Sequence, residues 1–364
     1  MRVAGIMSGT SLDGVDVAVV DIGRSKLQVV AFASVPYPAA LRERILAASN
    51  AMTHTAVISR LNFELGEQYA AAVRRVCRRK GVKVCSIDLV GCHGQTIFHE
   101  GVNTLQIGES CVLAERLRIP VVSDFRTRDI AAGGQGAPLV PFVDYRLFRH
   151  RKRGRVALNI GGIANITSIP AHAQPGEVIA FDTGPGNMVI DALVQEQSQG
   201  RQRFDRNGAI AAKGGVNRVL LEHLLQDPYY SAAPPKTAGR EQYGDQFVKR
   251  MKVSGLPMKS LIATATALSA RTIAAGIERF AQPAPKELIV AGGGTHNRTL
   301  MNALAALLPG IKILTTAEFG IPPDAKEAIA FAILAWETFH RRPSNLPSAT
   351  GARRAVVLGK ITPA

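Results

Sequence analysis

The segment MRVAGIMSGTSLDGVDVAVVDI, residues 1–22, decides how the first half of the chain folds. Apolar residues at Val3 to Met7 predict a strand, and the run Val15 to Ile22 predicts a second one. Between them lies the polar, glycine-rich turn Ser8 to Gly14. A third strand is expected at Leu27 to Ser34. Three short strands joined by tight turns are typical of an antiparallel meander.

The remainder of the first half alternates helix and strand. Apolar residues at helical spacing predict a helix, with Leu61, Leu65, Tyr69, Val73 and Val76 on one face. We then expect, in order, a strand at Ile87 to Gly91, a helix around Cys111 to Leu117 and a strand at Pro120 to Ser123. This alternation indicates parallel crossover units.

The second half repeats this order with different residues. We expect strands at Val156 to Ile160, Ile163 to Ile169, Val178 to Phe181, Leu288 to Ala291 and Lys312 to Thr315. Helices are expected around Ile273, Ile277 and Phe280 and from about Asp324 to His340. The tail, Arg341 to Ala364, either adds an edge strand at Ala355 to Leu358 or stays irregular. Two such repeats predict an α/β protein with two similar domains, residues 1–150 and 151–364, that face each other across a ligand-binding cleft.

Composition restricts the class of protein. The 364 residues are 46% hydrophobic and 20% charged, a globular balance in which no stretch reaches the roughly 20 apolar residues of a membrane span. Because no signal-like segment opens the chain, we expect a soluble cytoplasmic protein without a membrane partner. The four cysteines form no C-x-x-C pair, so we expect them to pack as small apolar side chains.

The net charge of +16 raises the possibility of a nucleic-acid partner. The densest basic run, Arg149 to Arg155, lacks interleaved aromatic residues, and the chain has no zinc-finger spacing. We therefore expect this run to be a solvated hinge between the domains, and no nucleic-acid partner. A basic surface would also attract anionic small molecules such as ATP.

Two glycine-rich hairpin turns hold equivalent places in the two repeats. Glycines let a backbone approach a phosphate closely, and the N–H groups of such a turn can bind anions. Asp13 is a candidate for holding Mg²⁺, directly or through water. Either turn alone is equally typical of a plain hairpin. The candidate residues are Gly9, Thr10, Ser11, Leu12, Asp13, Gly14, Val15 and Asp16 in the first repeat and Asn159, Gly161 and Gly162 in the second.

Two further motifs follow strands of the second repeat. Asp182 is expected at the carboxyl end of its strand, where a carboxylate can act as a general base; a helix cap or turn residue is the alternative. Gly184, Gly186 and Asn187 continue that motif. Gly292, Gly293 and Gly294 suit close approach to an adenosine, or else form a strand-to-helix turn with Asn297 as the helix cap.

Candidate sugar contacts come from three other segments. His93 and Gln95 are expected just beyond a strand end, where ligands of open α/β sheets bind, although a lone histidine is also common as a structural residue. Arg126 and Arg128 can clamp a carboxylate through paired N–H donors. Glu327 begins the last helix, where the helix dipole alone also favours an acid.

The motifs MSGTSLDGVD, GCHGQTIFH, QIGE, SDFRTRDIAAGGQGAPLVP, LNIGGIANIT, FDTGPGN and AGGGTHN occur in this order, within a match that runs from Met7 to beyond Glu327 and covers nearly the whole chain. Together they resemble the anhydro-N-acetylmuramic acid kinases of the actin, Hsp70 and hexokinase-like (ribonuclease H-like) superfamily. The resemblance implies an ATP- and Mg²⁺-dependent enzyme, a homodimer that acts in peptidoglycan recycling. It would convert 1,6-anhydro-N-acetylmuramic acid and water to N-acetylmuramic acid 6-phosphate.

The resemblance also implies roles for single residues. The segment Gly9 to Asp16 would bind the ATP phosphates, and Asp182 would activate the water that opens the anhydro ring. His93, Gln95, Arg126, Arg128 and Glu327 fall in segments similar to the sugar-binding surroundings of the family. Two alternatives stay open on the residues alone: a kinase of the same fold with another substrate, and a nucleotide-regulated switch module.

Overall fold

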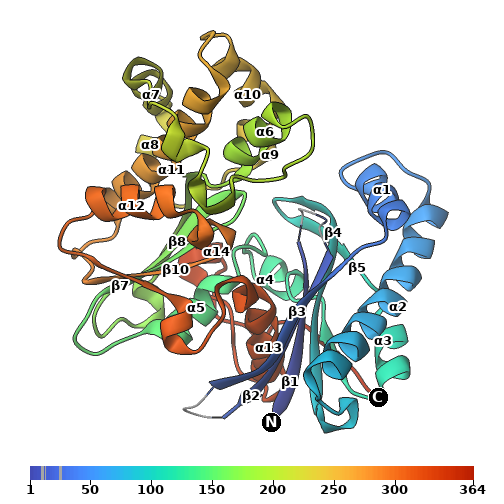
Figure 1. Cartoon of the computed structure of the whole chain (residues 1–364). Coiled ribbons are helices and arrows are strands. Elements are labelled where there is room, and N and C mark those ends of the chain that lie inside the picture. Colours follow the sequence, from blue (N-terminus) through green and yellow to red (C-terminus); the bar gives the residue numbers. More distant parts are fainter. Residues whose placement is uncertain (10–11, 13, 24–26) are drawn as a thin grey trace. The chain divides into compact units, whose positions relative to one another are not determined.

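The computed structural model, drawn in Figure 1, describes residues 1–9, 12, 14–23 and 27–364. The chain divides into two compact units, one of residues 1–143 and 325–364 and the other of residues 144–324. These bounds differ from the expected domains, 1–150 and 151–364, because the C-terminal segment packs with the first unit. The basic run 149–155 lies inside the second unit, a few residues beyond its start at Asp144, and its role as a hinge stays a prediction.

The first unit contains one mixed sheet in the order β12-β6-β4-β1-β2-β3, with β5 paired to β4. The pairs β1–β2 and β2–β3 are antiparallel, whereas β4 is parallel to both β1 and β6. The predicted meander and crossovers are therefore confirmed. The strands are β1 (Arg2–Ser8), β2 (Gly14–Ile22), β3 (Leu27–Pro36), β4 (Leu89–Glu100), β5 (Asn103–Ile107), β6 (Val121–Ser123) and β12 (Lys360–Thr362).

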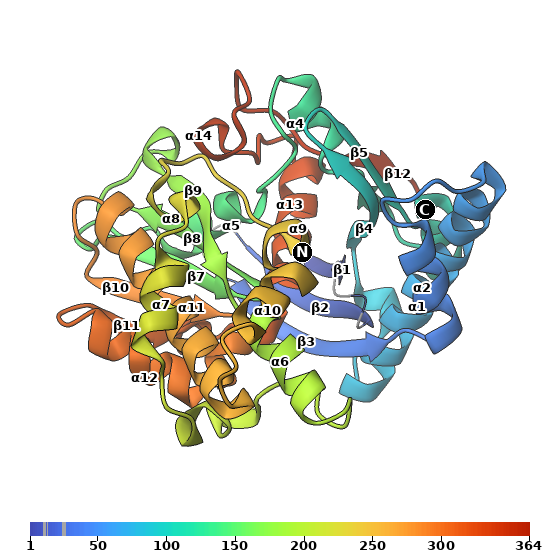
Figure 2. The same cartoon turned by 90° about the horizontal axis from the view of Figure 1, so that it is seen from above.

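Helices cover both faces of this sheet. In Figures 1 and 2, α13 lies on one side of β1 and α2 on the other. Leu61, Leu65 and Tyr69 of α2 belong to the same buried hydrophobic core as Ala4 and Ile6 of β1. The helices are α1 (Ala39–Ala48), α2 (Thr55–Lys80), α3 (Ser110–Leu117), α4 (Thr127–Ala131), α13 (Lys326–Phe339) and α14 (Pro347–Thr350).

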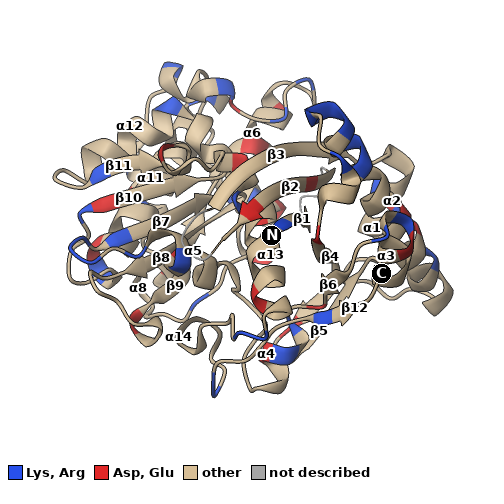
Figure 3. Ribbon diagram, turned by 90° about the horizontal axis from the view of Figure 1, so that it is seen from below, with Lys and Arg blue, Asp and Glu red and all other residues tan. Residues whose placement is uncertain are grey.

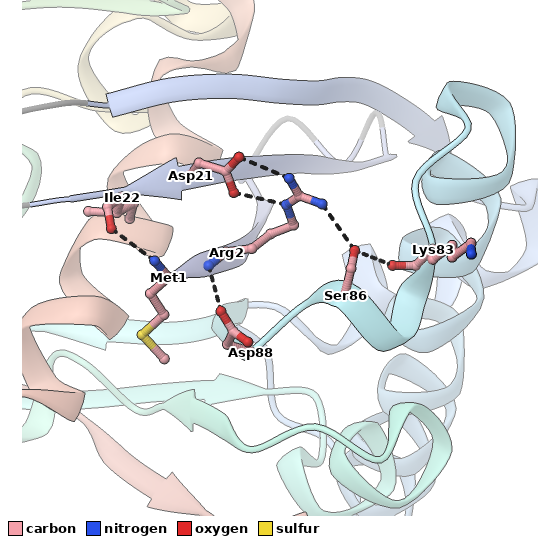
Figure 4. Close-up of polar contacts among 7 residues, drawn as sticks. All are labelled: Met1, Arg2, Asp21, Ile22, Lys83, Ser86 and Asp88. Carbon is pink, nitrogen blue, oxygen red and sulfur yellow. Dashed lines mark hydrogen bonds and ion pairs between the residues drawn. The ribbon is translucent and has the colours of Figure 1, made fainter.

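Polar contacts fix the start of β1 at the edge of this core (Figure 4). The Arg2 guanidinium donates to both carboxylate oxygens of Asp21 at 2.8 and 2.9 Å and to Ser86 Oγ at 3.1 Å. The Arg2 backbone N–H donates to the Asp88 carboxylate at 2.7 Å. These bonds join β1 to β2 and to the segment that leads into β4.

The second unit repeats the same topology. Its sheet has the order β11-β10-β7-β8-β9, in which β7, β8 and β9 are antiparallel and β10 is parallel to both β7 and β11. Both units therefore have the ribonuclease H-like arrangement, and the predicted fold class is confirmed. The strands are β7 (Arg155–Ile160), β8 (Ile163–Ile169), β9 (Ile179–Pro185), β10 (Glu287–Ala291) and β11 (Lys312–Thr315).

Helix α11 forms much of the core of the second unit. Its residues Ile273 and Ile277 belong to the same buried hydrophobic core as Val156 and Leu158 of β7. By length and composition α11 could cross a membrane, but 78% of its most apolar window is buried within the structure, as in the core helix of a folded domain. The helices are α6 (Met188–Gln197), α7 (Arg218–Leu225), α8 (Pro228–Ser231), α9 (Arg240–Tyr243), α10 (Asp245–Lys252), α11 (Met258–Phe280) and α12 (Arg298–Leu307), while α5 (Val140–Phe148) crosses the boundary between the units.

Short 3₁₀ turns connect several of these elements. They are Val84–Ser86 in the first unit, Pro175–Glu177, Arg206–Gly208, Ala211–Lys213, Gly293–His296 and Thr316–Phe319 in the second, and Pro323–Ala325 at the boundary between the units. In the tail, the edge strand is β12, which pairs antiparallel with β6; the predicted alternative at 355–358 is not a strand.

The basic residues are distributed unevenly. Figure 3 shows Lys and Arg gathered at the end of α2, whose last turn carries Arg78, Arg79 and Lys80. The run 149–155 is only partly solvated, because Arg155 is buried and donates to the buried Glu287 carboxylate at 2.7 Å. Arg153 forms an ion pair with the same carboxylate.

Candidate active site

The turn between β1 and β2 is described in part. Thr10, Ser11 and Asp13, and with them the expected metal ligand, lie outside the described residues. The Leu12 N–H donates to the Gly9 carbonyl at 3.2 Å. The Leu12 and Val15 side chains are buried in the core, so only their backbone groups are available to a ligand. Asp16 lies on β2 and accepts a hydrogen bond from Ser34 of β3.

The equivalent turn between β7 and β8 is packed against the start of α6. The Gly161 carbonyl accepts from the Asn187 N–H at 2.8 Å, and the Gly162 carbonyl accepts from the N–H groups of Gly186 and Met188 at 2.9 and 3.0 Å. A Cβ on Gly186 would lie 2.4 Å from the Gly161 carbonyl oxygen. Glycine at 186 is therefore required by backbone packing, whether or not a phosphate binds there.

Gly292 to Gly294 come to the same place from β10. A Cβ built on Gly292 would lie 2.7 Å from Asn159 Oδ1, and one on Gly294 would lie 2.3 Å from Ile160 Cγ2. The carboxyl ends of the parallel strands β7 and β10 thus meet here, with Asn187 Nδ2 donating to the Ile160 carbonyl at 3.2 Å. The structure brings together all the predicted nucleotide-binding residues of the second unit except Gly184.

Gly184 lies farther along, on β9. Asn297 accepts from the Leu300 N–H at 3.0 Å, so the expected cap of α12 is present. The segment Gly292 to Gly294 therefore leads from β10 toward the capped helix α12, as the strand-to-helix alternative expected. Contact of these glycines with an adenosine stays a prediction. Backbone N–H and C=O groups at a strand end are the usual means by which such loops approach a nucleotide.

Asp182 lies within β9, opposite Asn165 of β8, and not at the carboxyl end where the sequence placed it. The strand continues because the sheet pairs residues up to Pro185 despite the glycine at 184. Asp182 Oδ2 accepts a hydrogen bond of 2.8 Å from the Ala238 N–H. Burial raises the pKa of Asp182 to about 6, and the Ala238 N–H lowers it only in part. This carboxylate is ionised at neutral pH and basic enough to accept a proton.

His93 and Gln95 lie within β4, because that strand runs on to Glu100 and does not end at Gly91 as predicted. Both side chains are buried. Gln95 Nε2 donates weakly to the Gly9 carbonyl at 3.4 Å, which links this pair to the turn between β1 and β2. Gln95 Oε1 has no hydrogen-bond partner within the described residues.

Arg126 completes a polar group with His93 and Glu327. The Arg126 guanidinium donates to His93 Nε2 at 2.9 Å and to the Gly136 carbonyl at 2.8 Å. Because arginine only donates, His93 is neutral with its proton on Nδ1, and burial and the Arg126 charge hold its pKa well below the usual value. Burial lowers the pKa of Arg126 to about 10, and the Glu327 carboxylate opposes that shift.

Arg128 does not join this group in the part of the chain that the structure describes. Its side chain is exposed on α4. The paired arginine clamp expected from the sequence therefore reduces to Arg126, whose donors already serve His93 and Gly136. Among the described residues, no group of three or more His, Cys, Asp or Glu side chains is arranged to hold a metal ion.

Two groups of supporting residues, one in each unit, were missed by sequence reasoning. Asp129, inside a recognised motif, accepts from the Gly136 N–H at 2.8 Å and so supports the loop that Arg126 contacts. Tyr229, Lys236 and Ala238 contact Asp182 from a segment with no motif or periodicity. The sequence did show an aspartate, Asp129, shortly before a glycine-rich loop. No sequence pattern pointed to Tyr229, Lys236 or Ala238.

The protein has the fold of the actin, Hsp70 and sugar-kinase class. It has two ribonuclease H-like units, glycine-rich turns at strand ends and a buried aspartate whose pKa is raised. A family model described as anhydro-N-acetylmuramic acid kinase matches residues 1–364. The chain therefore belongs to the anhydro-N-acetylmuramic acid kinase family. The resemblance seen in the sequence and the prediction of a kinase are confirmed.

Curated relatives are similar to this chain over nearly their full length. An anhydro-N-acetylmuramic acid kinase of Caldanaerobacter subterraneus subsp. tengcongensis is 42% identical over 99% of this chain and 96% of the relative. One of Bacillus cereus (strain G9842) is 44% identical over 100% of this chain and 99% of the relative. Among solved structures, the activator of the 2-hydroxyisocaproyl-CoA dehydratase from Clostridium difficile aligns at 10% identity and a TM-score of 0.49, over 93% of this chain and 95% of that one.

Proposed function

We propose that this protein converts 1,6-anhydro-N-acetylmuramic acid, water and ATP to N-acetylmuramic acid 6-phosphate and ADP, as a step of peptidoglycan recycling. Membership of the kinase family supports the reaction class. The observation that carries the assignment of a base is the buried Asp182 carboxylate, whose pKa is raised to about 6. A general base works best when its pKa lies near the working pH.

The proposed reaction couples two bond changes. Asp182 takes a proton from water as the water oxygen bonds to the anomeric carbon, and the bond from that carbon to O6 breaks. O6 then takes the γ-phosphoryl group, which ATP supplies, and ADP leaves. Asp182 finally returns its proton to solvent, so one carboxylate does the proton work that inverting glycosidases divide between two.

The chain's own residues supply binding and orientation in this proposal. The turn from Gly9 to Asp16 and the glycines at the ends of β7 and β10 hold the nucleotide through backbone groups. Buried Gln95, with Oε1 unpartnered within the described residues, and the His93–Arg126 pair contact the sugar. Glu327 supports Arg126 electrostatically. A buried polar atom without a partner is costly, so a ligand group is a fitting partner for Gln95 Oε1.

We also propose that the reaction requires Mg²⁺, held by a carboxylate of the protein and by the ATP phosphates. Mg²⁺ is usually bound by one or two carboxylates together with substrate phosphates and water. Asp13 is the proposed carboxylate, and when bound the ion would neutralise phosphate charge. Loss of activity on chelation, restored by added Mg²⁺, tests this requirement, and isothermal titration of ATP into Asp13→Asn tests the residue.

Location and assembly are proposed on the family resemblance. We propose a cytoplasmic homodimer whose partners are the amino sugar and ATP, without nucleic acid or membrane. Light scattering on the purified protein measures the mass in solution. Fluorescence anisotropy with labelled DNA at low and high salt tests the nucleic-acid alternative that the charge of +16 raises.

The decisive experiment is the mass of the product formed from the anhydro sugar with ATP and Mg²⁺. One added phosphate and one added water support the coupled reaction, whereas a phosphate without water indicates an ordinary sugar kinase. Absence of product beside slow ADP release favours a switch module. Asp182→Asn should abolish product while ATP still binds, and loss of ATP binding as well would give Asp182 a structural role.

A further inference from the structure

A segment of the second unit, residues 229–238, is bonded to Asp182 at three points; we name it the Asp182 strap. The Tyr229 hydroxyl donates to the Asp182 carbonyl at 2.7 Å. The Asp182 N–H donates to the Lys236 carbonyl at 3.1 Å, and the Ala238 N–H donates to the carboxylate at 2.8 Å. The strap therefore satisfies the backbone N–H and C=O of Asp182 as well as one carboxylate oxygen.

The position of β9 explains why such a strap is needed. This strand is at the edge of its sheet, with β8 as its neighbour on one side only. Backbone groups on an open edge otherwise bond to water. By pairing with Asp182, the strap closes this edge at the one residue whose side chain is proposed to react.

Lys236 holds the strap together. Its ammonium donates to the carbonyls of Tyr229 and Tyr230 at 2.9 and 3.2 Å, so it joins the end of the strap to its beginning. The Nζ atom also lies 4.9 Å from the ring centre of Tyr229, 5.4 Å from that of Phe181 and 5.1 Å from that of Phe280. A partly desolvated cation among three aromatic rings is held by cation–π attraction.

We propose that Lys236 is a positioning residue for catalysis, which closes the strap over β9 and so holds the Asp182 carboxylate in place to accept a proton. This inference rests on the proposed function, since it takes Asp182 as the base. The rings link the strap to β9 through Phe181 and to α11 through Phe280. Lys236 thus acts through Ala238 and Tyr229, and not on the substrate.

The charged and titratable neighbours agree with this role. Tyr229 faces Asp182 from α8, and burial and the Asp182 charge raise its pKa, so it stays a neutral donor. Burial and Arg279 of α11 lower the pKa of Lys236. If the strap opens, water reaches Asp182 and the burial that raises its pKa is relieved. The pKa of Asp182 should then fall from about 6 toward that of an ordinary carboxylate.

The test compares three full-length variants with the wild type. Lys236→Met keeps the length of the side chain and removes its charge and donors, whereas Lys249→Met makes the same change at an exposed position of α10. Tyr229→Phe removes only the hydroxyl that donates to Asp182. Initial rates are measured from pH 5 to 8 at saturating and limiting sugar, the KM for ATP is measured at saturating sugar, and the fold of each variant is checked by circular dichroism.

We expect Lys236→Met to lower kcat by about 10- to 100-fold, the usual cost of a misplaced reacting group. The KM for ATP should be unchanged, and the low-pH limb of the rate profile should move to lower pH. Tyr229→Phe should show a smaller change in the same direction, and Lys249→Met should match the wild type. If Lys236→Met does not fold, the pH profile of Tyr229→Phe decides.

Wild-type rates and pH profiles in both Lys236→Met and Tyr229→Phe would overturn the strap proposal. Asp182→Asn separates this outcome from failure of the proposed function. If Asp182→Asn is inactive while the strap variants behave as wild type, only the role of Lys236 is wrong. If Asp182→Asn itself turns over normally, the assignment of the base is wrong and the strap proposal falls with it.

Discussion

The Thr350 hydroxyl donates a hydrogen bond of 2.8 Å to Asp129 Oδ1, although 221 residues separate the two along the chain. Asn345 Nδ2 donates to the same oxygen at 2.6 Å, and the Gly136 N–H donates to Oδ2 at 2.8 Å. Asp129 is completely buried. This carboxylate therefore ties the C-terminal segment to the loop whose Gly136 carbonyl accepts from Arg126.

Replacing Asp129 should destabilise the first unit and disturb Arg126. Asp129→Ala removes the acceptor of the Gly136 N–H and leaves Thr350 and Asn345 with only long bonds of 3.3 and 3.4 Å to the carbonyls of Leu346 and Arg354, so we expect a loss of about 3 kcal/mol in the free energy of unfolding. Thr350→Val removes one donor with little change of shape and should cost only about 1 kcal/mol. Urea unfolding followed by fluorescence measures both. Equal losses of unfolding free energy in the two variants would contradict the role of Asp129 as the acceptor that three donors share.

The pH dependence of activity should report Asp182. Since the pKa of Asp182 is about 6 and a base must be ionised, kcat/KM should fall about tenfold per pH unit below pH 6 and level off above it. Below this pKa the carboxylate is protonated and cannot accept the proton of water. Rates from pH 4.5 to 8, corrected for stability, measure this limb. A flat profile down to pH 5 would mean that the base is another group.

A methyl group at Gly186 should weaken ATP binding. In Gly186→Ala the new Cβ would lie 2.4 Å from the Gly161 carbonyl oxygen, so the turn between β7 and β8 has to move. Gly176→Ala is a matched control, because nothing lies within 4 Å of its Cβ position. Isothermal titration with ATP should show weaker binding for Gly186→Ala and unchanged binding for the control. Unchanged binding in both variants would mean that this turn does not contact ATP.

Local periodicity was enough to predict most of the strands of both sheets and the longest helices. The meander of the first unit follows from apolar runs and turns that neighbouring residues specify, and each pairs as expected. The strand containing His93 was cut short at Gly91, whereas in the structure Gly91 pairs with Gly5 of β1 and the pairing with β5 extends the strand from Gln95 to Glu100. Tertiary pairing thus overrides local preference where a strand has a partner.

The parts that escaped prediction depend on contacts between distant residues. The C-terminal segment joins the first unit through Asp129 and Thr350, and no local pattern records such a bond. The strap residues Tyr229 and Lys236 lie 47 and more residues beyond Asp182 in a segment with no strand or helix pattern. Sequence motifs identified the groups that are expected to react. The residues that hold those groups in place could be found only from contacts in the structure.

The buried ion pair of the second unit gives a last prediction, on stability and its dependence on pH. Glu287 and Arg155, at 4% and 10% side-chain exposure, are joined by a bond of 2.7 Å between β10 and β7. Glu287→Gln leaves the Arg155 charge without its partner, which should cost about 3 kcal/mol in the free energy of unfolding. Glu222→Gln, which breaks an exposed pair with Arg271, should cost less than about 1 kcal/mol.

Burial alone would raise the pKa of Glu287, but Arg155 and Arg153 together lower it below its ordinary value of 4.5. The stabilisation by this pair is therefore complete above the unfolded-state pKa and is lost as the pH falls through the lower pKa of the folded state. The difference in stability between wild type and Glu287→Gln, measured by urea unfolding, should be constant from pH 6 to 8 and should shrink below about pH 4.5. A difference that persists unchanged at pH 3 would mean that the carboxylate contributes by packing and not by its charge.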